Sequence, residues 1–305
     1  MPIPYGVIRT AWRSGNVVPF VGAGASLVGR STPNEQWTLG CPFLPSAAEL
    51  AAYLAGESGF PSTDLQEISD LAKVSSYCAL RGGKRGLAAA LRAVFCCQVG
   101  KSNFKPGVLH RYVASVPCMQ LIITTNYDDL LETAFRDAGT KFDLMVYPAD
   151  NAAHSNEVMW QSYNEERKFV LPDKLPVDFD HLTRTIIYKM HGSIADIESF
   201  DSFVITEEDY VSFLYRMTTR TAIPPLVLEF LADKSLLFLG YGLKDWNLRL
   251  IQQNLSGFLA ERARKRVAVP SWAIQKAPSA VDEELWKSRN VQIFSQDVEA
   301  FAAAM

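Results

Sequence analysis

Short apolar runs alternate with longer amphipathic stretches along most of this 305-residue chain. Each run has the length of a buried β-strand, and the stretches between the runs have the spacing of helices. This alternation is typical of a parallel sheet that carries helices on both faces. The sequence therefore predicts an α/β fold with strands at residues 17–21, 120–125, 184–190, 235–240, 267–274 and 291–295.

Two of the predicted helices are marked by their ends. Residues 127–139 (YDDLLETAFRDAG) carry apolar side chains at helical spacing and stop at Gly139, which suits a left-handed C-cap. Residues 245–260 (DWNLRLIQQNLSGFLA) show the same spacing, and Asp245 is their expected N-cap. Both helices follow a predicted strand, as in a doubly wound sheet.

Two regions interrupt this alternation. Residues 41–116 contain the Ala- and Leu-rich stretches SAAELAAYLAG and GLAAALRAVFCC without an obvious strand, which predicts an inserted helical module. Residues 148–180 are polar, a composition that fits a surface excursion or lid better than a core element. We expect residues 1–305 to form a single domain that includes both regions.

The composition argues against direct binding of nucleic acid, zinc or a membrane. Lys and Arg total 30 against 33 Asp and Glu, so the net charge of -3 gives no basic surplus for binding a nucleic-acid backbone. The five cysteines form no CxxC pair, which supports neither a disulfide framework nor a zinc module. No stretch approaches the roughly 18 apolar residues of a membrane span. We expect a cytoplasmic protein that binds neither nucleic acid nor membrane directly.

The stretch VVPFVGAGAS (17–26) joins an apolar strand to a glycine-rich turn. Backbone N–H groups in such a turn can bind a nucleotide phosphate at a helix start. A dinucleotide-binding fingerprint would have a third glycine at position 27, where Leu27 stands, so a simple hydride-transfer enzyme is disfavoured. Taken alone, Gly22 and Gly24 are equally consistent with a tight turn that binds nothing.

Polar or glycine-rich stretches also follow three other predicted strands. TTNYD follows the second strand, MHGS the third and GYGLKD the fourth. Because the carboxyl ends of parallel strands line one crevice, these residues are expected to meet around one ligand. Asn126 and His191 are the candidates for chemistry there, because an amide can orient water or hydroxyl groups and an imidazole can accept a proton at neutral pH.

In this order, GAGAS (22–26), TTNYD (124–128), MHGS (190–193) and GYGLKD (240–245) resemble the motifs of sirtuins, and more closely those of the sirtuin-like NAD-cleaving domains of bacterial antiviral defence systems. The resemblance covers about residues 15–255. It implies a Rossmann-like core in which the first turn holds the pyrophosphate of NAD. It places the family's catalytic asparagine and histidine on Asn126 and His191. It also implies NAD-binding roles for Gly22, Ala23, Gly24, Ser26, Thr125, Asp128, Gly240, Tyr241 and Gly242, with Asp128 contacting the nicotinamide amide.

The chain departs from the deacylating sirtuins in two respects. It has neither their zinc module with two CxxC pairs nor the arginine of a PDFR stretch after the first motif, where an insertion beginning GRSTPNEQW stands instead. The defence-type domains also lack the zinc module. The resemblance therefore implies an NAD+ glycohydrolase that forms nicotinamide and ADP-ribose or a cyclic product, with NAD as substrate and no metal. The alternatives are a module that senses NAD or a related nucleotide and, third, a protein deacylase.

Each candidate residue also has a structural alternative. Asn126 could cap the helix that follows it, and His191 could be a satisfied turn histidine. Asp128 suits the first turn of a helix electrostatically, and Ser26 could cap a helix start. The aromatic stretch YVSFLY (210–215), which follows the capping box TEED, is interpreted as core packing.

Control of an NAD-cleaving activity is expected from outside the chain, because an enzyme that freely destroys NAD would harm its own cell. The expected partners are a second copy of the chain or a separately encoded protein. For the latter, the resemblance suggests an ATPase or helicase-like protein or a nucleic-acid-guided protein. The predicted lid at 148–180 returns just before the strand that leads to His191, which makes it the expected gate.

Overall fold

The computed structural model describes residues 2–32, 35–96, 104–149, 154, 156–194, 202–218, 223–241 and 269–305. The helix expected at 245–260, with its cap Asp245, lies outside these residues. Among the described residues, no helix is both long enough and apolar enough to cross a membrane.

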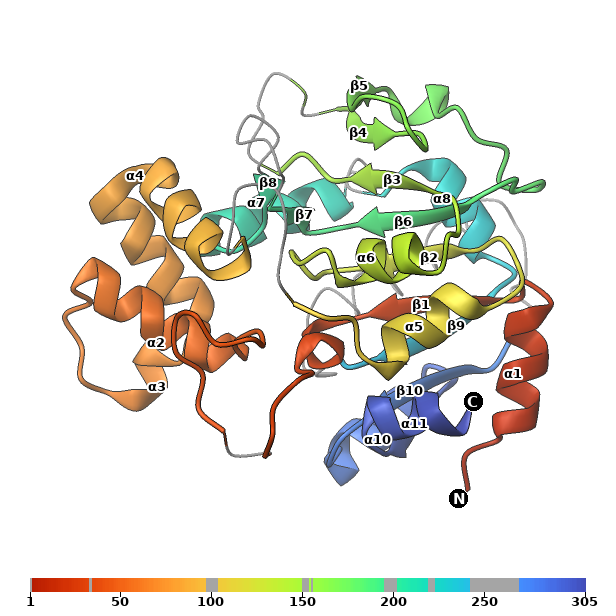
Figure 1. Cartoon of the computed structure of the whole chain (residues 1–305), viewed down its shortest axis with the longest axis horizontal. Coiled ribbons are helices and arrows are strands. Elements are labelled where there is room, and N and C mark those ends of the chain that lie inside the picture. The colour runs from red at the N-terminus through yellow and green to blue at the C-terminus, as the bar shows by residue number, and fades with distance from the viewer. Residues whose placement is uncertain are drawn as a thin grey trace.

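A mostly parallel sheet forms the centre of the described fold (Figure 1). Its strands are β1 (Val17–Val21), β2 (Leu121–Thr124), β3 (Phe142–Val146), β4 (Val158–Gln161), β5 (Lys168–Val170), β6 (Thr185–Lys189), β9 (Ser235–Leu239), β10 (Ser271–Gln275) and β11 (Val291–Ser295). They are arranged in the order β11-β10-β9-β1-β2-β6-β3-β4-β5. The pairs from β11 to β3 are parallel, whereas β4 and β5 pair antiparallel. A short separate pair joins β7 (Gly192–Ser193) to β8 (Ser202–Phe203).

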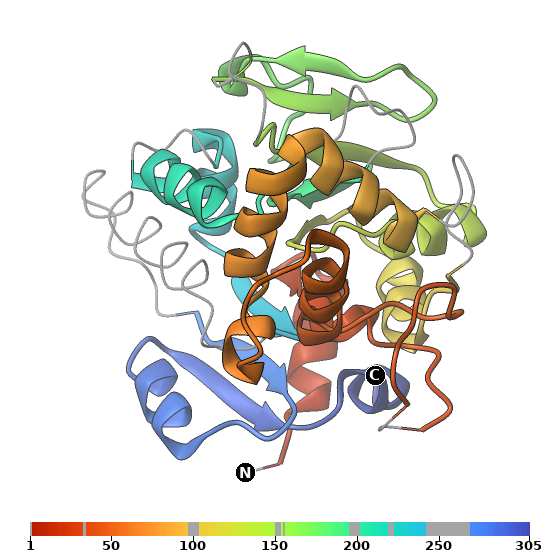
Figure 2. The same cartoon turned by 90° about the vertical axis from the view of Figure 1, so that its left-hand side faces the viewer.

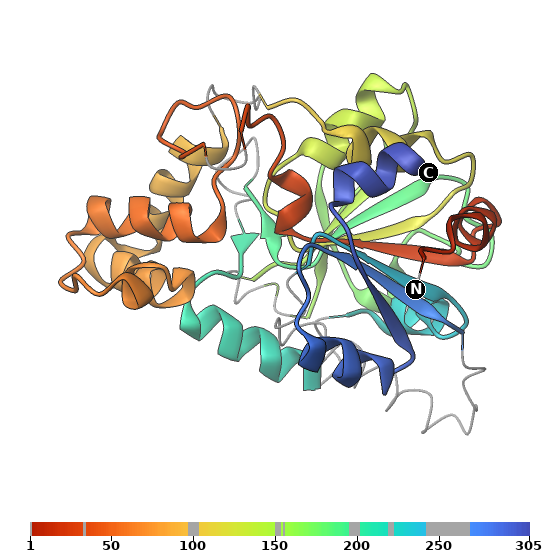
Figure 3. The same ribbon diagram turned by 90° about the horizontal axis from the view of Figure 1, so that it is seen from below.

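Helices cover both faces of this sheet, as the view from below in Figure 3 shows. The helices are α1 (Tyr5–Arg13), α2 (Ala47–Ser58), α3 (Leu65–Ile68), α4 (Leu71–Phe95), α5 (Val108–Ser115), α6 (Leu130–Asp137), α7 (Glu207–Thr218), α8 (Pro225–Leu231), α10 (Ala280–Lys287) and α11 (Val298–Ala304), with 3-10 turns η1 (Ala23–Ser26) and η3 (Pro172–Lys174). Alternate residues of β1 face opposite cores. Val18 and Phe20 pack with α7 and α8, while Val17 and Val21 pack with α1, α5 and α6. The predicted Rossmann-like α/β class is confirmed.

All six strands expected from the sequence are present. β10 begins at Ser271 rather than at 267, and β3 was not expected at all. The run FDLMV that forms β3 lies just before the polar segment 148–180, and it was not among the six strands predicted above. Parallel pairing with β6 buries all but the first of its residues.

Helices α2, α3 and α4 form a module with its own hydrophobic core, built around Leu54, Leu87 and Leu91. We call these three helices the helical module. It lies beyond the carboxyl ends of the parallel strands, and Figure 2 looks onto it from that side. Within its described residues, the insertion expected at 41–116 holds helices α2, α3, α4 and α5 joined by loops, and no strand. Its last helix, α5, does not belong to the module, because Leu109 and Val113 pack on the sheet.

The segment 148–180 contributes to the sheet. Val158 and Trp160 of β4 are buried in the main core, and β5 forms the edge strand beside them. The expectation that this segment holds no core element is therefore wrong. The polar composition of the segment gave no signal for its two short antiparallel strands. One of them, β5, is at least partly exposed along its length. A gating role for the segment stays a prediction.

Candidate active site

A cleft of about 1210 Å³ lies between the carboxyl ends of the central strands and the helical module. The loops that follow β1, β2, β6 and β9 line it, and these four strands are neighbours in the sheet. The chain order reverses at β1, because β2 lies on one side of β1 and β9 on the other. Ligands of open α/β sheets bind at such a point. The predicted convergence of the four strand-end motifs is confirmed for their described residues.

Contact with the loop after β9 shapes the GAGAS loop. The Gly24 N–H donates to the Gly240 carbonyl oxygen at 2.9 Å, and a Cβ on Gly24 would come within 2.8 Å of that oxygen. Gly240 has a φ of +71°, and a Cβ on it would overlap the Ala25 nitrogen. The loop continues into the single 3-10 turn η1 rather than into an α-helix. Close approach of two backbone loops therefore explains these glycines.

Two acceptors hold the Asn126 side chain. Its Nδ2 donates to the Gly22 carbonyl oxygen at 3.0 Å and to the Ser26 hydroxyl oxygen at 2.9 Å. Both amide hydrogens are thereby used, which fixes the direction of Oδ1. This oxygen is buried and has no hydrogen-bond partner within the described residues. Asn126 does not cap α6, whose N-cap position is held by Asp129.

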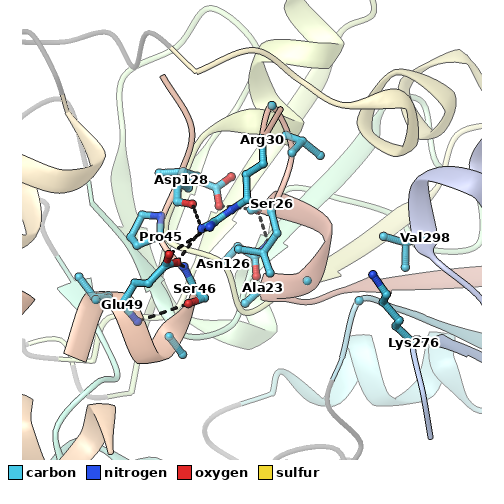
Figure 4. A pocket seen from close by; sticks show the side chains of 18 of the residues that line it. Ala23, Ser26, Arg30, Pro45, Ser46, Glu49, Asn126, Asp128, Lys276 and Val298 are labelled. Carbon is cyan, nitrogen blue, oxygen red and sulfur yellow. Dashed lines mark hydrogen bonds and ion pairs between the residues drawn. The ribbon is translucent and has the colours of Figure 1, made fainter. Parts of the chain in front are cut away.

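Asp128 completes this network. The Ser26 hydroxyl donates to Asp128 Oδ2 at 2.7 Å, so the serine links Asp128 to Asn126. Figure 4 shows the three side chains together on one wall of the cleft. Asp128 Oδ1 accepts the Leu130 N–H at the start of α6, so the helix-start role also holds. Burial raises the pKa of Asp128, and the charge of Lys189 and the Ser26 hydrogen bond oppose that rise.

His191 lies two residues after the end of β6 and directly before β7, and it is 4% exposed. The rings of Tyr210 and Phe213 from α7 lie edge-on to it, with ring centroids 5.8 and 5.2 Å away. Burial lowers the pKa of His191 to about 3, so the imidazole is neutral at pH 7. Its Nε2 is buried and has no hydrogen-bond partner in the described part of the chain. The histidine therefore does not have the near-neutral pKa on which the sequence-based expectation rested.

Most of the predicted site residues line the cleft: Asn126 and His191, and with them Ala23, Gly24, Ser26, Thr125, Asp128, Gly240 and Tyr241. Gly22 is not among the lining residues, but its carbonyl oxygen anchors Asn126. Gly242 lies outside the described residues. The Thr125 hydroxyl donates to the Tyr241 hydroxyl at 3.2 Å, which joins the loops after β2 and β9. The ligand-binding roles of all these residues stay predictions.

The insertion after GAGAS forms one wall of the cleft. The Arg30 guanidinium pairs with both carboxylate oxygens of Glu49, at 3.0 and 2.6 Å. Glu49 also accepts the N–H groups of Trp37 and Ser46, which fastens the insertion to the start of α2. These contacts hold the pKa of Glu49 at about 2. Both charges are therefore satisfied inside the wall.

Sequence reasoning missed the other end of the cleft. Gln275 is the last residue of β10 and Lys276 follows it, Gln296 follows β11, and all three line the cleft. Gln275 Oε1 is buried without a partner among the described residues. Figure 4 shows Lys276 and Val298 across the cleft from Glu49. The strand-end rule that found the four motifs would have found these residues as well.

Two residues beside His191 were also missed. Tyr210 lines the cleft, although the stretch YVSFLY was interpreted as core packing. The capping box before it is confirmed, because Thr206 and Asp209 exchange backbone-to-side-chain hydrogen bonds. Lys189 is buried two residues before His191. The sequence could have pointed to it, because a lysine within the apolar strand TIIYK is unusual. Within the described residues, no group of three or more His, Cys, Asp or Glu could hold a metal ion.

Comparison with known proteins agrees with this architecture. The family model described as "SIR2-like domain" matches residues 120–294. The chain is 28% identical over 262 residues to the NAD(+) hydrolase ThsA of Enterococcus faecium, covering 85% of this chain and 44% of that protein. It is 23% identical over 206 residues to the NAD(+) hydrolase ThsA of Cytobacillus dafuensis, covering 66% of this chain and 33% of that protein. The matched region thus spans less than half the length of either relative.

Proposed function

The chain belongs to the SIR2-like family, and from that membership we propose that it is an NAD+ glycohydrolase. One observation carries the proposal. Asn126 Oδ1 and His191 Nε2 are buried polar atoms of the cleft lining, and neither has a partner within the described residues. Buried polar atoms normally find partners, so such atoms in a cleft are suited to a ligand. The printed names of the two relatives, both NAD(+) hydrolases, support the same activity.

The reaction breaks the bond between ribose C1′ and the nicotinamide nitrogen. The bonding electron pair leaves with nicotinamide, which becomes a neutral ring, and positive charge develops at the sugar. Water then forms the new bond to C1′ and gives up a proton. Because the leaving group needs no protonation, the protein's contribution is positioning and charge stabilisation. We assign Asn126 Oδ1 to the water or a ribose hydroxyl, and Asp128 to the nicotinamide amide.

His191 Nε2 is assigned as the acceptor of the proton from water. Its pKa of about 3 keeps the imidazole neutral and ready to accept at physiological pH. Such a group is a weak base, but water that adds to an oxocarbenium-like sugar becomes strongly acidic. Weak basicity is therefore sufficient for this step. The cleft continues to Gln275 and Lys276, which gives room for the rest of the dinucleotide.

The test is incubation of the purified chain with NAD+ and chromatographic separation of the products. The proposal expects nicotinamide together with ADP-ribose or a cyclic product, and loss of both in Asn126→Ala and His191→Ala. His181→Ala is the matched control, because this histidine side chain is 84% exposed. Binding of NAD+ without product would assign the chain to the sensor class. NAD+-dependent release of an acyl group from an acylated peptide would assign it to the deacylases.

In the cell, we propose that the chain depletes NAD in the cytoplasm as part of antiviral defence. Its activity would be controlled by self-association or by a separately encoded ATPase, helicase-like or nucleic-acid-guided protein. Light scattering after size exclusion, combined with the NAD+ assay across protein concentration and with candidate partners, tests this. A monomer that is equally active at every dilution and with every partner would refute it.

A further inference from the structure

Lys189 occupies an unusual place for a lysine. It is the last residue of β6, it is 1% exposed, and His191 follows two residues later. Its backbone is fixed on both sides, because β6 pairs with β2 at Thr124 and with β3 at Val146. A buried ammonium group is costly unless its hydrogens are all bonded.

Three oxygens surround the Lys189 ammonium group. Nζ donates to the Asp128 carbonyl at 2.6 Å, to Glu132 Oε1 at 2.9 Å and to the Tyr127 carbonyl at 3.2 Å. An ammonium group has three N–H donors, so all of them are used. Both carbonyls belong to the loop that joins β2 to α6, which we call the 126–128 loop. Lys189 thus binds the backbone directly after Asn126.

The stability that the ion pair with Glu132 gives to the fold does not explain why a lysine stands at this buried position. Glu132 is 4% exposed, and its Oε2 is buried without a partner among the described residues. A buried ion pair with an unsatisfied carboxylate oxygen contributes little compared with apolar side chains of similar volume. The specific effect of Lys189 is geometric, because it fixes two carbonyl groups that precede α6.

We propose that Lys189 is a positioning residue for NAD+ cleavage. By holding the carbonyls of Tyr127 and Asp128, it fixes the 126–128 loop so that Asn126 Oδ1 faces the cleft. The inference rests on the proposed function. A misplacement of a reacting group by about 1 Å costs on the order of a hundredfold in rate, so loosening this loop lowers kcat much more than it weakens NAD+ binding.

The test replaces the whole ion pair, because Lys189→Met alone would leave the Glu132 charge buried and unpaired. The double variant Lys189→Met/Glu132→Leu is expected to fold with a melting temperature close to that of the wild type. Its kcat for nicotinamide release should fall about 100-fold, with KM changed less than about 3-fold. Hydrogen exchange of the 126–130 amides should accelerate, a readout that requires no activity. Glu132→Gln, which leaves both carbonyl bonds in place, should retain kcat within about 3-fold.

Lys73→Met/Glu67→Leu removes an ion pair of 2.5 Å in the helical module and is the matched control, with activity expected to be unchanged. A folded Lys189→Met/Glu132→Leu variant with wild-type kcat or unchanged loop exchange would overturn the proposal. So would a double variant that does not fold, because the pair would then serve stability, or a Glu132→Gln variant that loses kcat equally. An inactive wild-type chain would count against the proposed function, while the exchange measurement would still test Lys189.

Discussion

The Asn126 amide nitrogen lies 2.9 Å from the Ser26 hydroxyl oxygen, and the same hydroxyl donates to Asp128 at 2.7 Å. Ser26 thus connects two residues that follow β2 with the loop that follows β1. The GAGAS motif suggested a phosphate contact or a helix cap for this serine. In the structure it ends η1 and orients the side chain of Asn126.

Ser26→Ala removes one of the two acceptors that fix the Asn126 amide. We expect kcat for nicotinamide release to fall about fivefold, because the loss of one hydrogen bond is worth about 1 kcal/mol. KM for NAD+ should change little. Ser69→Ala is the control, since its hydroxyl bonds the Gln66 carbonyl on the protein surface. An increase in KM with unchanged kcat would instead assign Ser26 to phosphate binding.

The pH dependence of kcat tests the environment of His191. Burial lowers its pKa to about 3, so the neutral, proton-accepting form persists down to about pH 4. We expect no inflection of kcat near pH 6.5, where an ordinary histidine titrates. Initial rates between pH 5 and pH 8 check this, with folding monitored at each pH. A tenfold loss of rate per pH unit below 6.5 in a folded protein would show that His191 is solvated in the working enzyme, once the same loss in Asp128→Asn excludes the Asp128 carboxyl, whose pKa burial raises.

Gly240 is the glycine whose replacement should cost most at the cleft. Gly240→Ala would place a Cβ against the Ala25 nitrogen in a residue with φ of +71°, so we expect a loss of at least about 2 kcal/mol in unfolding free energy. Gly56→Ala, inside α2 with open space around its Cα, should stabilise by about 0.5–1 kcal/mol. Urea unfolding measures both. Equal stability of the two variants would contradict the close-packed description of the two loops.

The parts of the fold that the sequence predicted are those with a continuous signal. β1, β2, β6 and β9 are runs of residues buried on both faces, and each is followed by a distinctive polar or glycine-rich stretch. β4 and β5 are short and lie at the edge of the sheet within a polar segment, so their apolar residues did not stand out. Local patterns do not reveal a short strand such as β4, whose burial depends on pairing with β3 and β5.

Some residues of the candidate site could likewise be predicted from the sequence, and others could not. Asn126 and His191 could be found because each stands directly after a strand. The contact between Lys189 and Glu132 joins residues 57 positions apart, and the spacing of residues in the chain does not reveal such a pair. The lowered pKa of His191 could not be predicted from the sequence either, because it results from burial of the ring by α7.

His110 provides a separate test of burial, outside the cleft lining. It lies in α5 at 1% exposure, its Nδ1 accepts the Gly107 N–H, and burial lowers its pKa to about 4. The unfolded chain, with a histidine pKa of about 6.5, therefore binds more protons than the folded chain below that pH. Stability from this group is complete above about pH 6.5 and is lost as the pH falls toward 4.

Urea unfolding at pH 7.5 and pH 5.0 should therefore show a smaller pH-dependent loss of stability in His110→Asn than in the wild type. The expected difference is about 2 kcal/mol, the linkage free energy of one histidine with these two pKa values over that interval. Asn keeps an acceptor for the Gly107 N–H and does not titrate in this range. His181→Asn is the control, because that histidine side chain is 84% exposed. If His110→Asn and the wild type lose the same stability between the two pH values, then His110 is protonated in the folded protein and its burial in α5 does not hold in solution.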